Sequence, residues 1–251
     1  MNKIIISLVG LFLFSSSYAQ TTFPENGVKN NFKPVHAFTN ATIVVSPFQT
    51  IKNGTLIIKD DKILSADTTT SIPKGAIIHD LNGDYIYSSF IDLNSNYGIL
   101  KGKAVNYSHR PQYQTKKEGA FAWNEAIHPE IDASTIFKHN EKEAEKYRNI
   151  GIGVVLSHKQ DGIARGSGLL TTLSDNTEHL TILNLKASAH YSFLKGSSKQ
   201  NYPSSLMGSI ALLTQTYLDA EWYLQNTKKE KNLSLEAWNK LQDLPQFFKT
   251  T

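Results

Sequence analysis

The sequence predicts an α/β fold with a small all-β domain before it, and three observations support this. Short β-branched runs separated by turn residues fill residues 38–87, the pattern of a set of antiparallel strands. From Ser88 onward, an apolar strand, a helix and a second apolar strand follow one another, which is the order of a βαβ unit. A long helical pattern then begins near Ser205.

Residues 1–19 have the composition of a secretory signal peptide. Lys3 comes before an apolar run from Ile4 to Phe14, and small residues stand at Ser17 and Ala19. A membrane span needs about 20 apolar residues, and this run is roughly half as long. We therefore expect export to the periplasm or the medium with cleavage after Ala19. No later segment is long and apolar enough to span a membrane.

Composition restricts the class of protein. The chain has 251 residues, 40% of them hydrophobic, which suffices for one medium domain or two small ones. It has no cysteine, so disulfides and thiolate metal sites are excluded and stability must come from a packed core. The formal net charge of +4 is small and dispersed, which argues against a nucleic-acid partner.

The all-β domain follows an extended polar segment at residues 20–37. Turn signals at Asp60-Asp61 and Asn82-Gly83 predict two hairpins, because the glycine of the second supplies a positive backbone angle. His79 lies on a predicted strand and is expected at the sheet surface.

The second part, residues 88–251, begins with "SSFIDL", a short strand of the fully buried kind. The polar residues 94–122 after it predict a long functional loop or lid. Residues 133–151 predict one helix that Ser134 or Thr135 caps and Gly151 ends. The apolar run "IGVVLS" predicts the next buried strand, and the strand–helix–strand order predicts a parallel sheet.

A glycine-rich segment, "ARGSG", follows that strand. Arg165, Gly166 and Gly168 could form a cradle for an anion, with backbone amides and a guanidinium, or a plain tight turn. The segment has neither the lysine of a P-loop nor the glycine spacing of a dinucleotide site, which favours the turn.

The last third predicts two helices, the first capped by Ser204 or Ser205 and the second by Ser234. Apolar side chains recur in the first helix at intervals of three and four residues, and we interpret them as helix core: Met207, Ile210, Leu213 (or Leu212), Tyr217, Leu218 and Trp222.

Several stretches resemble a known family. "NGTLIIKDDKILSAD" and "IPKGAIIHDLNGDYIYSSFID" resemble the start of amidohydrolase-superfamily enzymes of the imidazolonepropionase-like and dihydroorotase-like type. "WNEAIHPEIDAS", "YRNIGIGVVLSHKQDGIARGSG" and "YPSSLMGSIALLTQTYLDAEWY" are similar to exported bacterial members. The resemblance covers residues 38–223. It implies a β-sandwich-like composite domain of the urease-α type, followed by the first strands and helices of a TIM-type barrel, because too few residues remain after Ser88 for eight strands.

The resemblance also implies a chemistry. In the family, two histidines after the first barrel strand bind a divalent metal, typically zinc, and the metal-bound water attacks a carbon–nitrogen bond other than a peptide bond. Those two positions are Asn94 and Asn96 here, and a neutral amide oxygen is a weak ligand for zinc. A lysine position of the family falls on Ser192, with Lys195 three residues on. We therefore expect no metal cofactor in this chain and impaired or absent hydrolysis of small cyclic amides or peptide-like substrates.

Two residues are the best candidates for a catalytic site. Asp92 ends the first barrel strand, where its carboxylate either faces the catalytic edge or accepts bonds from the following loop. His158 follows the second buried strand at the same end and either lines a pocket or bonds to backbone. The acidic group formed by Glu125, Glu130 and Asp132 predicts a solvated face.

Two functions remain open at this point. The chain is either a hydrolase-derived protein with a degenerate metal site, or a non-catalytic exported module. Such a module would pack against a complete amidohydrolase barrel domain, downstream or on a separate subunit, because an open barrel leaves strand edges and apolar surface uncovered.

Overall fold

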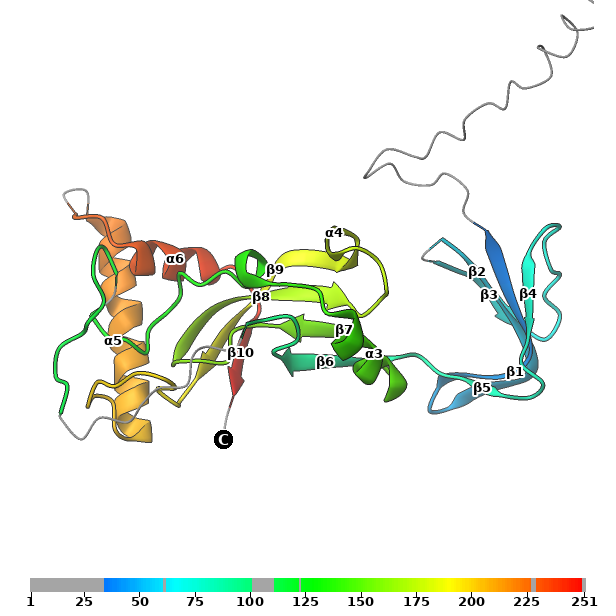
Figure 1. The fold of residues 1–251 in the computed structure, drawn as a ribbon, viewed down its shortest axis with the longest axis horizontal. Coiled ribbons are helices and arrows are strands. Elements are labelled where there is room, and N and C mark those ends of the chain that lie inside the picture. Colours follow the sequence, from blue (N-terminus) through cyan, green and yellow to red (C-terminus); the bar gives the residue numbers. More distant parts are fainter. Residues whose placement is uncertain (1–33, 61, 101–110, 122, 227–228, 250–251) are drawn as a thin grey trace, which may run out of the picture. The chain divides into compact units, whose positions relative to one another are not determined.

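The computed structural model describes residues 34–249 except 61, 101–110, 122 and 227–228. The predicted signal peptide and most of the extended segment after it lie outside the described residues. The chain divides between Ser88 and Ser89 into two compact units, the β unit and the mixed unit (Figure 1).

The β unit holds one five-stranded sheet. Its strands are β1 (Val35–Ser46), β2 (Gln49–Lys59), β3 (Lys62–Asp67), β4 (Ile77–Asp80) and β5 (Tyr85–Ile86). β1, β2 and β3 are antiparallel neighbours, whereas β4 and β5 both pair with β1 in parallel. The core of the unit is formed by Ala41, Ile43 and Leu56. The predicted sandwich-like arrangement stays a prediction.

The turn at Asn82-Gly83 is not the hairpin that the sequence suggests. Because β4 and β5 run in the same direction along β1, the turn between them does not reverse the chain. Asn82 and Gly83 do adopt positive φ angles, 49° and 97°, and the Gly83 amide donates to the Asn40 carbonyl oxygen at 2.7 Å. The turn therefore holds the chain against the middle of β1.

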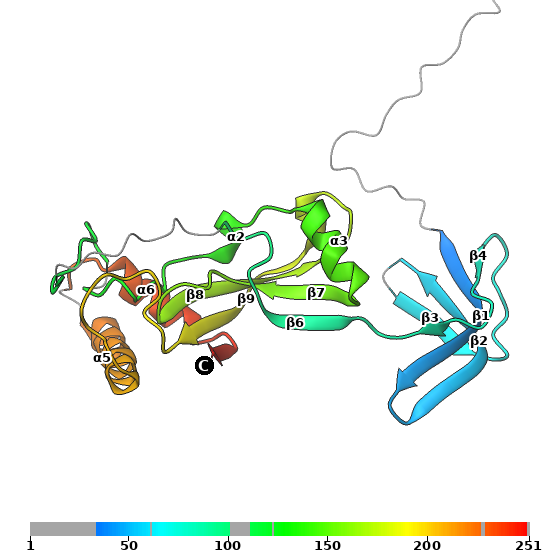
Figure 2. The ribbon, with the colours of Figure 1, turned by 60° about the horizontal axis from the view of Figure 1, so that its bottom comes forward.

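The mixed unit contains one sheet and the described helices. Its strands are β6 (Phe90–Ser95), β7 (Ile152–Ser157), β8 (Ala164–Thr172), β9 (Ile182–Ser192) and β10 (Gln246–Lys249). Its helices are α2 (Ala133–Ile136), α3 (Glu141–Asn149), α4 (Glu178–Thr181), α5 (Leu206–Gln225) and α6 (Leu233–Leu241). Figure 2 shows α2 and α3 on one face of the sheet.

The sequence predicts a parallel sheet in the mixed unit, but the sheet contains both parallel and antiparallel strand pairs. Its order is β10-β9-β8-β7-β6; β6 pairs with β7 and β9 with β10 in parallel, but β8 is antiparallel to both of its neighbours. The parallel βαβ unit of β6, α3 and β7 is therefore present. The next strand reverses because residues 158–163 are too few for a parallel crossover, which needs about a dozen residues.

The helix predicted over residues 133–151 is two helices. Asp132 caps α2, since its carboxylate accepts from the Ser134 amide, and Asn140 caps α3, since its side chain accepts from the Glu143 amide. A capping residue has a non-helical backbone, which the bond from its side chain to the first turn stabilises. Asn140 therefore starts a new helix and interrupts the predicted one. Gly151, at φ 88°, follows the end of α3.

Two predicted core elements are largely exposed. β6 is an edge strand, with Phe90 71% and Ile91 59% exposed, because among the described strands it pairs with β7 alone. In α5 most of the predicted core stripe also faces outward, with Met207 79% and Trp222 59% exposed, whereas Leu213 packs against the buried core of the mixed unit. The buried face of α5 is instead rotated from it, and is formed by Ser209, Leu212, Thr216, Ala220 and Tyr223. α5 is apolar around most of its circumference, so periodicity could not identify the covered face.

The direction of the strands fixes where a site can form. β6, β7, β9 and β10 run in one direction, so their carboxyl ends lie at one edge of the sheet, and the antiparallel β8 begins there. We call this the carboxyl edge. The main core beneath it packs α5 and α6 against the start of β8 and the end of β9. Among the described helices, none has the length and apolarity to cross a membrane.

Candidate functional site

The carboxyl edge brings together polar side chains that are far apart in the sequence. β6 ends on Asn94 and Ser95, and β7 is followed directly by His158. β9 contributes His190 near its end, and β10 ends on Lys249. In α/β sheets, ligand sites form at the carboxyl ends of co-oriented strands.

A pocket of about 260 Å³ opens at this edge. Strand ends and the residue after β7 supply its walls: Leu93, Asn94, His158, His190, Tyr191, Phe247, Phe248 and Lys249. We call it the edge pocket. Its described wall combines two imidazoles, an amide, an ammonium group and aromatic rings, and none of these described residues carries a carboxylate.

His158 and His190 form a parallel stack in the edge pocket. Their ring centroids lie 3.7 Å apart with an interplanar angle of 4°, and the Phe247 ring stacks on His190 at 5.5 Å. His158 is fully buried, and neither of its ring nitrogens has a hydrogen-bond partner. Of its two predicted settings, the structure places His158 in the wall of a pocket, with the backbone of Leu156 close enough to act on the ring.

The other ring of the stack is held by a serine and a glycine. His190 Nε2 lies 2.7 Å from Ser188 Oγ. A Cβ atom at Gly168 would lie 2.5 Å from both of these atoms. Gly168 is thus required for close approach of the neighbouring strand to the stack. Sequence reasoning identified Gly168 but not this role, because its partners lie twenty residues further along the chain.

The segment Ala164–Gly168 is part of β8, so neither the tight turn nor the backbone anion cradle forms. Gly166 has φ 84°, and a Cβ there would lie 1.9 Å from the Ile131 carbonyl oxygen, to which the Ser167 amide donates. Arg165 is buried, with its Nε donating to the Gly162 carbonyl oxygen. Its Nη1 is buried without a hydrogen-bond partner.

The electrostatic environment of the stack is positive. Burial, together with the neighbouring groups His190, Arg165 and Lys249, lowers the pKa of His158 to about 2. Burial and Arg165 lower the pKa of His190 to about 4. Burial also lowers the pKa of Arg165, and Asp161 opposes this. At neutral pH the two imidazoles are therefore uncharged, beside a buried guanidinium.

The polar side chains of β6 face different partners. Asp92 Oδ1 accepts from the Asn94 amide at 2.9 Å, and Asp92 is not among the residues that line the edge pocket. The sequence predicts that Asp92 either faces the catalytic edge or accepts bonds from the following loop, and the structure shows such a bond to the backbone. Asn94 receives Gln160 Nε2 at its carbonyl oxygen, 2.8 Å away, and at Oδ1, 3.4 Å away. Asn96 is half-buried after the strand end.

The position expected for a family lysine is also at the carboxyl edge. Ser192 ends β9, is buried, and accepts from the Leu194 amide through Oγ at 3.0 Å. Lys195 instead points to the Gln200 carbonyl oxygen, 2.7 Å from its Nζ. Lys195 thus forms a local loop contact and is not part of the edge-pocket wall.

The acidic residues predicted as a solvated face are separate structural contacts. Glu130 is 3.3 Å from Lys117 Nζ and accepts from Ser234 Oγ at 2.9 Å. Asp132 pairs with Lys186 at 2.9 Å. Glu125 accepts from the Lys116 amide at 2.8 Å. Each carboxylate ties its loop to another segment, so the prediction of a free acidic face is wrong.

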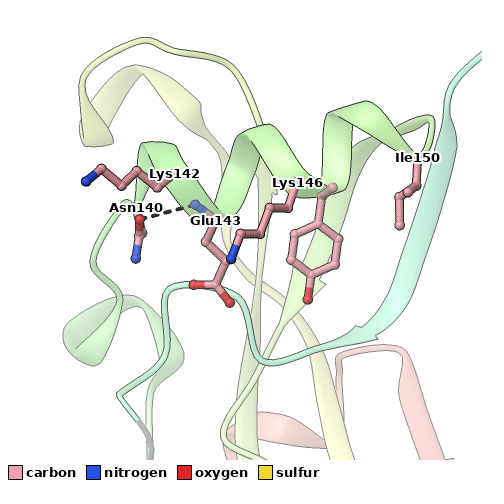
Figure 3. Close-up of a pocket in the computed structure, with 6 residues that line it drawn as sticks. Asn140, Lys142, Glu143, Lys146 and Ile150 are labelled. Carbon is pink, nitrogen blue, oxygen red and sulfur yellow. Dashed lines mark hydrogen bonds between the residues drawn. The ribbon is translucent and has the colours of Figure 1, made fainter.

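A larger hollow of about 550 Å³ lies along α3, away from the carboxyl edge (Figure 3). Residues of this helix and its caps line it, among them Glu143, Lys146 and Tyr147. Asn140 is occupied as the helix cap, bonding to the Glu143 amide at 3.2 Å. The hollow is open and contains no convergent set of unpartnered buried groups, so the edge pocket is the better candidate site.

The described residues contain no group of three or more histidine, cysteine or acidic side chains placed to hold a metal ion. No protein-family model matches the chain, and no curated protein matches it. Among solved structures, the crystal structure of an amidohydrolase from Thermotoga maritima MSB8 is similar, with a TM-score of 0.63 and 19% identity. The match covers 84% of this chain and 57% of that protein. The chain therefore has an amidohydrolase-like fold.

Proposed function

We propose that this chain is an amidohydrolase-type protein that does not itself perform metal-dependent hydrolysis. The amidohydrolase-like fold supports the first part. The reaction class that we propose for the complete protein is hydrolysis of carbon–nitrogen bonds other than peptide bonds. The second part rests on the end of β6, where the sequence resemblance aligns Asn94 and Asn96 with the two expected histidines.

The remaining donors at the carboxyl edge do not replace that pair. A zinc ion binds imidazole in the plane of the ring, about 2.0–2.1 Å from the nitrogen. The rings of His158 and His190 are stacked, 3.7 Å apart and within 4° of parallel. An ion in the plane of one ring is therefore out of the plane of the other, and the two imidazoles cannot both bind it without breaking the stack. The residues present do not fit a catalytic zinc site.

We also propose that the sheet of the mixed unit is the first part of a TIM-type barrel. Its four co-oriented strands support this, as does the match to 57% of the solved amidohydrolase. The substrate of a complete protein would be a small cyclic amide or a peptide-like compound. Export to the periplasm or the medium is proposed from the composition of residues 1–19 alone.

Restoring the histidine pair tests the proposed function. The purified wild-type chain and the Asn94→His/Asn96→His variant would be loaded with zinc or manganese, and metal content and hydrolysis of a cyclic amide measured. We expect the wild type to retain no stoichiometric metal and to be inactive, and the variant to retain more metal because imidazole replaces amide. Asn176→His, an exposed substitution elsewhere, serves as a control for added imidazole. Stoichiometric metal and turnover in the wild type would reject the proposal.

The exposed apolar face of α5 favours a second candidate function, that of a non-catalytic module. Met207, Tyr217, Leu218 and Trp222 are all at least 49% exposed on this helix. Large apolar side chains exposed along one helix can serve as an interaction site. The module would pack against a complete amidohydrolase barrel domain, downstream on the same polypeptide or on a separate subunit.

Light scattering during size-exclusion chromatography tests the second candidate. Without its partner, the wild-type chain should self-associate as its concentration rises, and Leu218→Lys should reduce this association. Lys240→Glu, an exposed substitution on α6, is the control and should leave it unchanged. A wild-type chain that stays monomeric at all concentrations would contradict the module hypothesis.

A further inference from the structure

We propose that the edge pocket binds a small organic carboxylate, which contacts His158 and Lys249 and lies against the aromatic rings of β10. The inference does not depend on the proposed function, because binding of a carboxylate requires neither a metal nor hydrolysis. It does concern the same edge of the sheet.

The imidazole of His158 has no hydrogen-bond partner among the described residues. A neutral imidazole has one N–H donor and one acceptor nitrogen, and buried groups of this kind are normally hydrogen-bonded. Both ring nitrogens of His158 are buried without a partner in a residue that lines the pocket. His190 Nε2, by contrast, is satisfied by Ser188. An N–H without an acceptor on a pocket wall is suited to a ligand that supplies an acceptor oxygen.

The edge pocket carries positive charge. Lys249 lines the pocket, and the buried guanidinium of Arg165 acts on both imidazoles of the stack. Asp161 acts on Arg165, but among the described residues no carboxylate stands in the pocket wall. A concave site with one sign of charge and low-dielectric walls concentrates the opposite charge. The ligand is therefore an anion.

The size and the aromatic walls of the edge pocket favour a small planar ligand. The pocket volume of about 260 Å³ is slightly below that of sites for drug-sized ligands, so the ligand is small. Phe247 continues the ring stack beyond His190, and Phe248 forms another part of the wall. Asn94 adds an amide that can donate to a second oxygen. A planar carboxylate carried on a ring matches these walls better than the tetrahedral phosphate ion does.

Titration of the full chain with benzoate tests the inference, with histidine ring signals followed by NMR and affinity measured by calorimetry. We expect saturable binding at one site that shifts the ring signals of His158 and His190. The signals of His36 and His79, a second stacked pair in the β unit 5.3 Å apart, should not move. Acetate should bind more weakly, because it lacks the ring. Inorganic phosphate should bind more weakly still, and uncharged benzyl alcohol should not saturate.

Charge removal at the exposed Lys249 gives the decisive variant, because it leaves the core unchanged. Lys249→Met should weaken benzoate binding about fivefold or more, and Lys249→Arg should preserve it. Lys240→Met, which removes a lysine from α6, should have no effect. Equal affinity for phosphate and benzoate, saturable binding of benzyl alcohol, or unchanged affinity in Lys249→Met would each overturn the inference. The presence or absence of zinc-dependent hydrolysis would not affect it.

Discussion

The residues that define the candidate site act through partners that are distant in the sequence. His158 stacks on His190, and Gly168 lets the intervening strand approach them. His158 and Gly168 can be identified from the sequence because each has an unusual local setting, one after a buried strand and one in a glycine-rich run. The stack itself cannot be predicted, because nothing local in the sequence around His190 indicates which residue it faces.

The stacked imidazoles predict a specific loss of stability in acid. With pKa values of about 2 for His158 and about 4 for His190, both rings stay neutral in the folded protein below the ordinary value of 6.5. The unfolded chain binds these protons, so stability is present above about pH 6.5 and decreases as the pH falls. Two protons give a slope of up to about 2.7 kcal/mol per pH unit. Urea unfolding between pH 7 and pH 4.5 should show this slope in the wild type.

Replacing both imidazoles provides the comparison for this prediction. The His158→Gln/His190→Gln variant should lose most of the extra slope, although its stability at neutral pH will also change because the stack is gone. The comparison therefore concerns slopes and not absolute stabilities. Equal slopes in the two proteins would contradict the buried, uncharged state of the stack.

A side chain at Gly168 should clash with the stack, and a second substitution should partly relieve that clash. Gly168→Ala places a Cβ 2.5 Å from both His190 Nε2 and Ser188 Oγ, and overpacking of this kind costs about 1–3 kcal/mol. Ser188→Ala removes one of the two atoms in conflict. In a double-mutant cycle of denaturant unfolding, the two substitutions together should therefore cost less than the sum of their separate effects. Simple additivity would show that Gly168 does not constrain the stack.

At the scale of elements, the sequence predicts types of element better than their exposure. The parallel pair β6 and β7, the cap of α5 at Ser205 and the strands of the β unit follow from local patterns. The exposure of β6 could not be predicted, because an apolar strand has the same pattern at an edge as at the centre of a sheet. The reversal at β8 depends on the length of the connection before it.

Glu130 holds the start of α6 against the loop before α2 through its bond from Ser234. Burial alone would raise its pKa, but His128, Lys117 and Ser234 outweigh this and lower it to about 2. The shift from 4.5 corresponds to roughly 3 kcal/mol at most, present above about pH 4.5 and lost as the pH falls toward 2. Glu130→Gln should therefore destabilise the protein near pH 7 and lose this effect in acid.

Thermal or urea unfolding at several pH values measures the Glu130 effect. Glu145→Gln, which removes an exposed carboxylate from α3, is the matched control and should change stability little. A difference between wild type and Glu130→Gln that persists undiminished at the lowest pH would contradict an ionised Glu130 as its cause.

The two sides of α5 should respond differently to truncation. Leu212 is 1% exposed and belongs to the main core, so Leu212→Ala should cost about 2–5 kcal/mol. Leu218 is 50% exposed, and Leu218→Ala should change the free energy of unfolding by less than about 0.5 kcal/mol. Denaturant unfolding of dilute protein measures both. Equal costs would mean that the predicted core stripe is covered after all.

At the scale of the whole molecule, the order of motifs predicts the fold that the solved amidohydrolase shares, although no single motif is specific. The candidate site is predicted in part. His158 and the asparagines after β6 are found from the sequence, whereas His190 and Lys249 are not, because strand order decides which ends meet at one edge. The central claim is that these ends do not form a zinc site.

Anomalous diffraction from crystals grown with zinc tests that claim most directly. We expect no fully ligated ion at the end of β6, because Asn94 and Asn96 supply only amide oxygens, and an intact stack of His158 on His190. An anomalous peak at that position with complete coordination by protein side chains would contradict it.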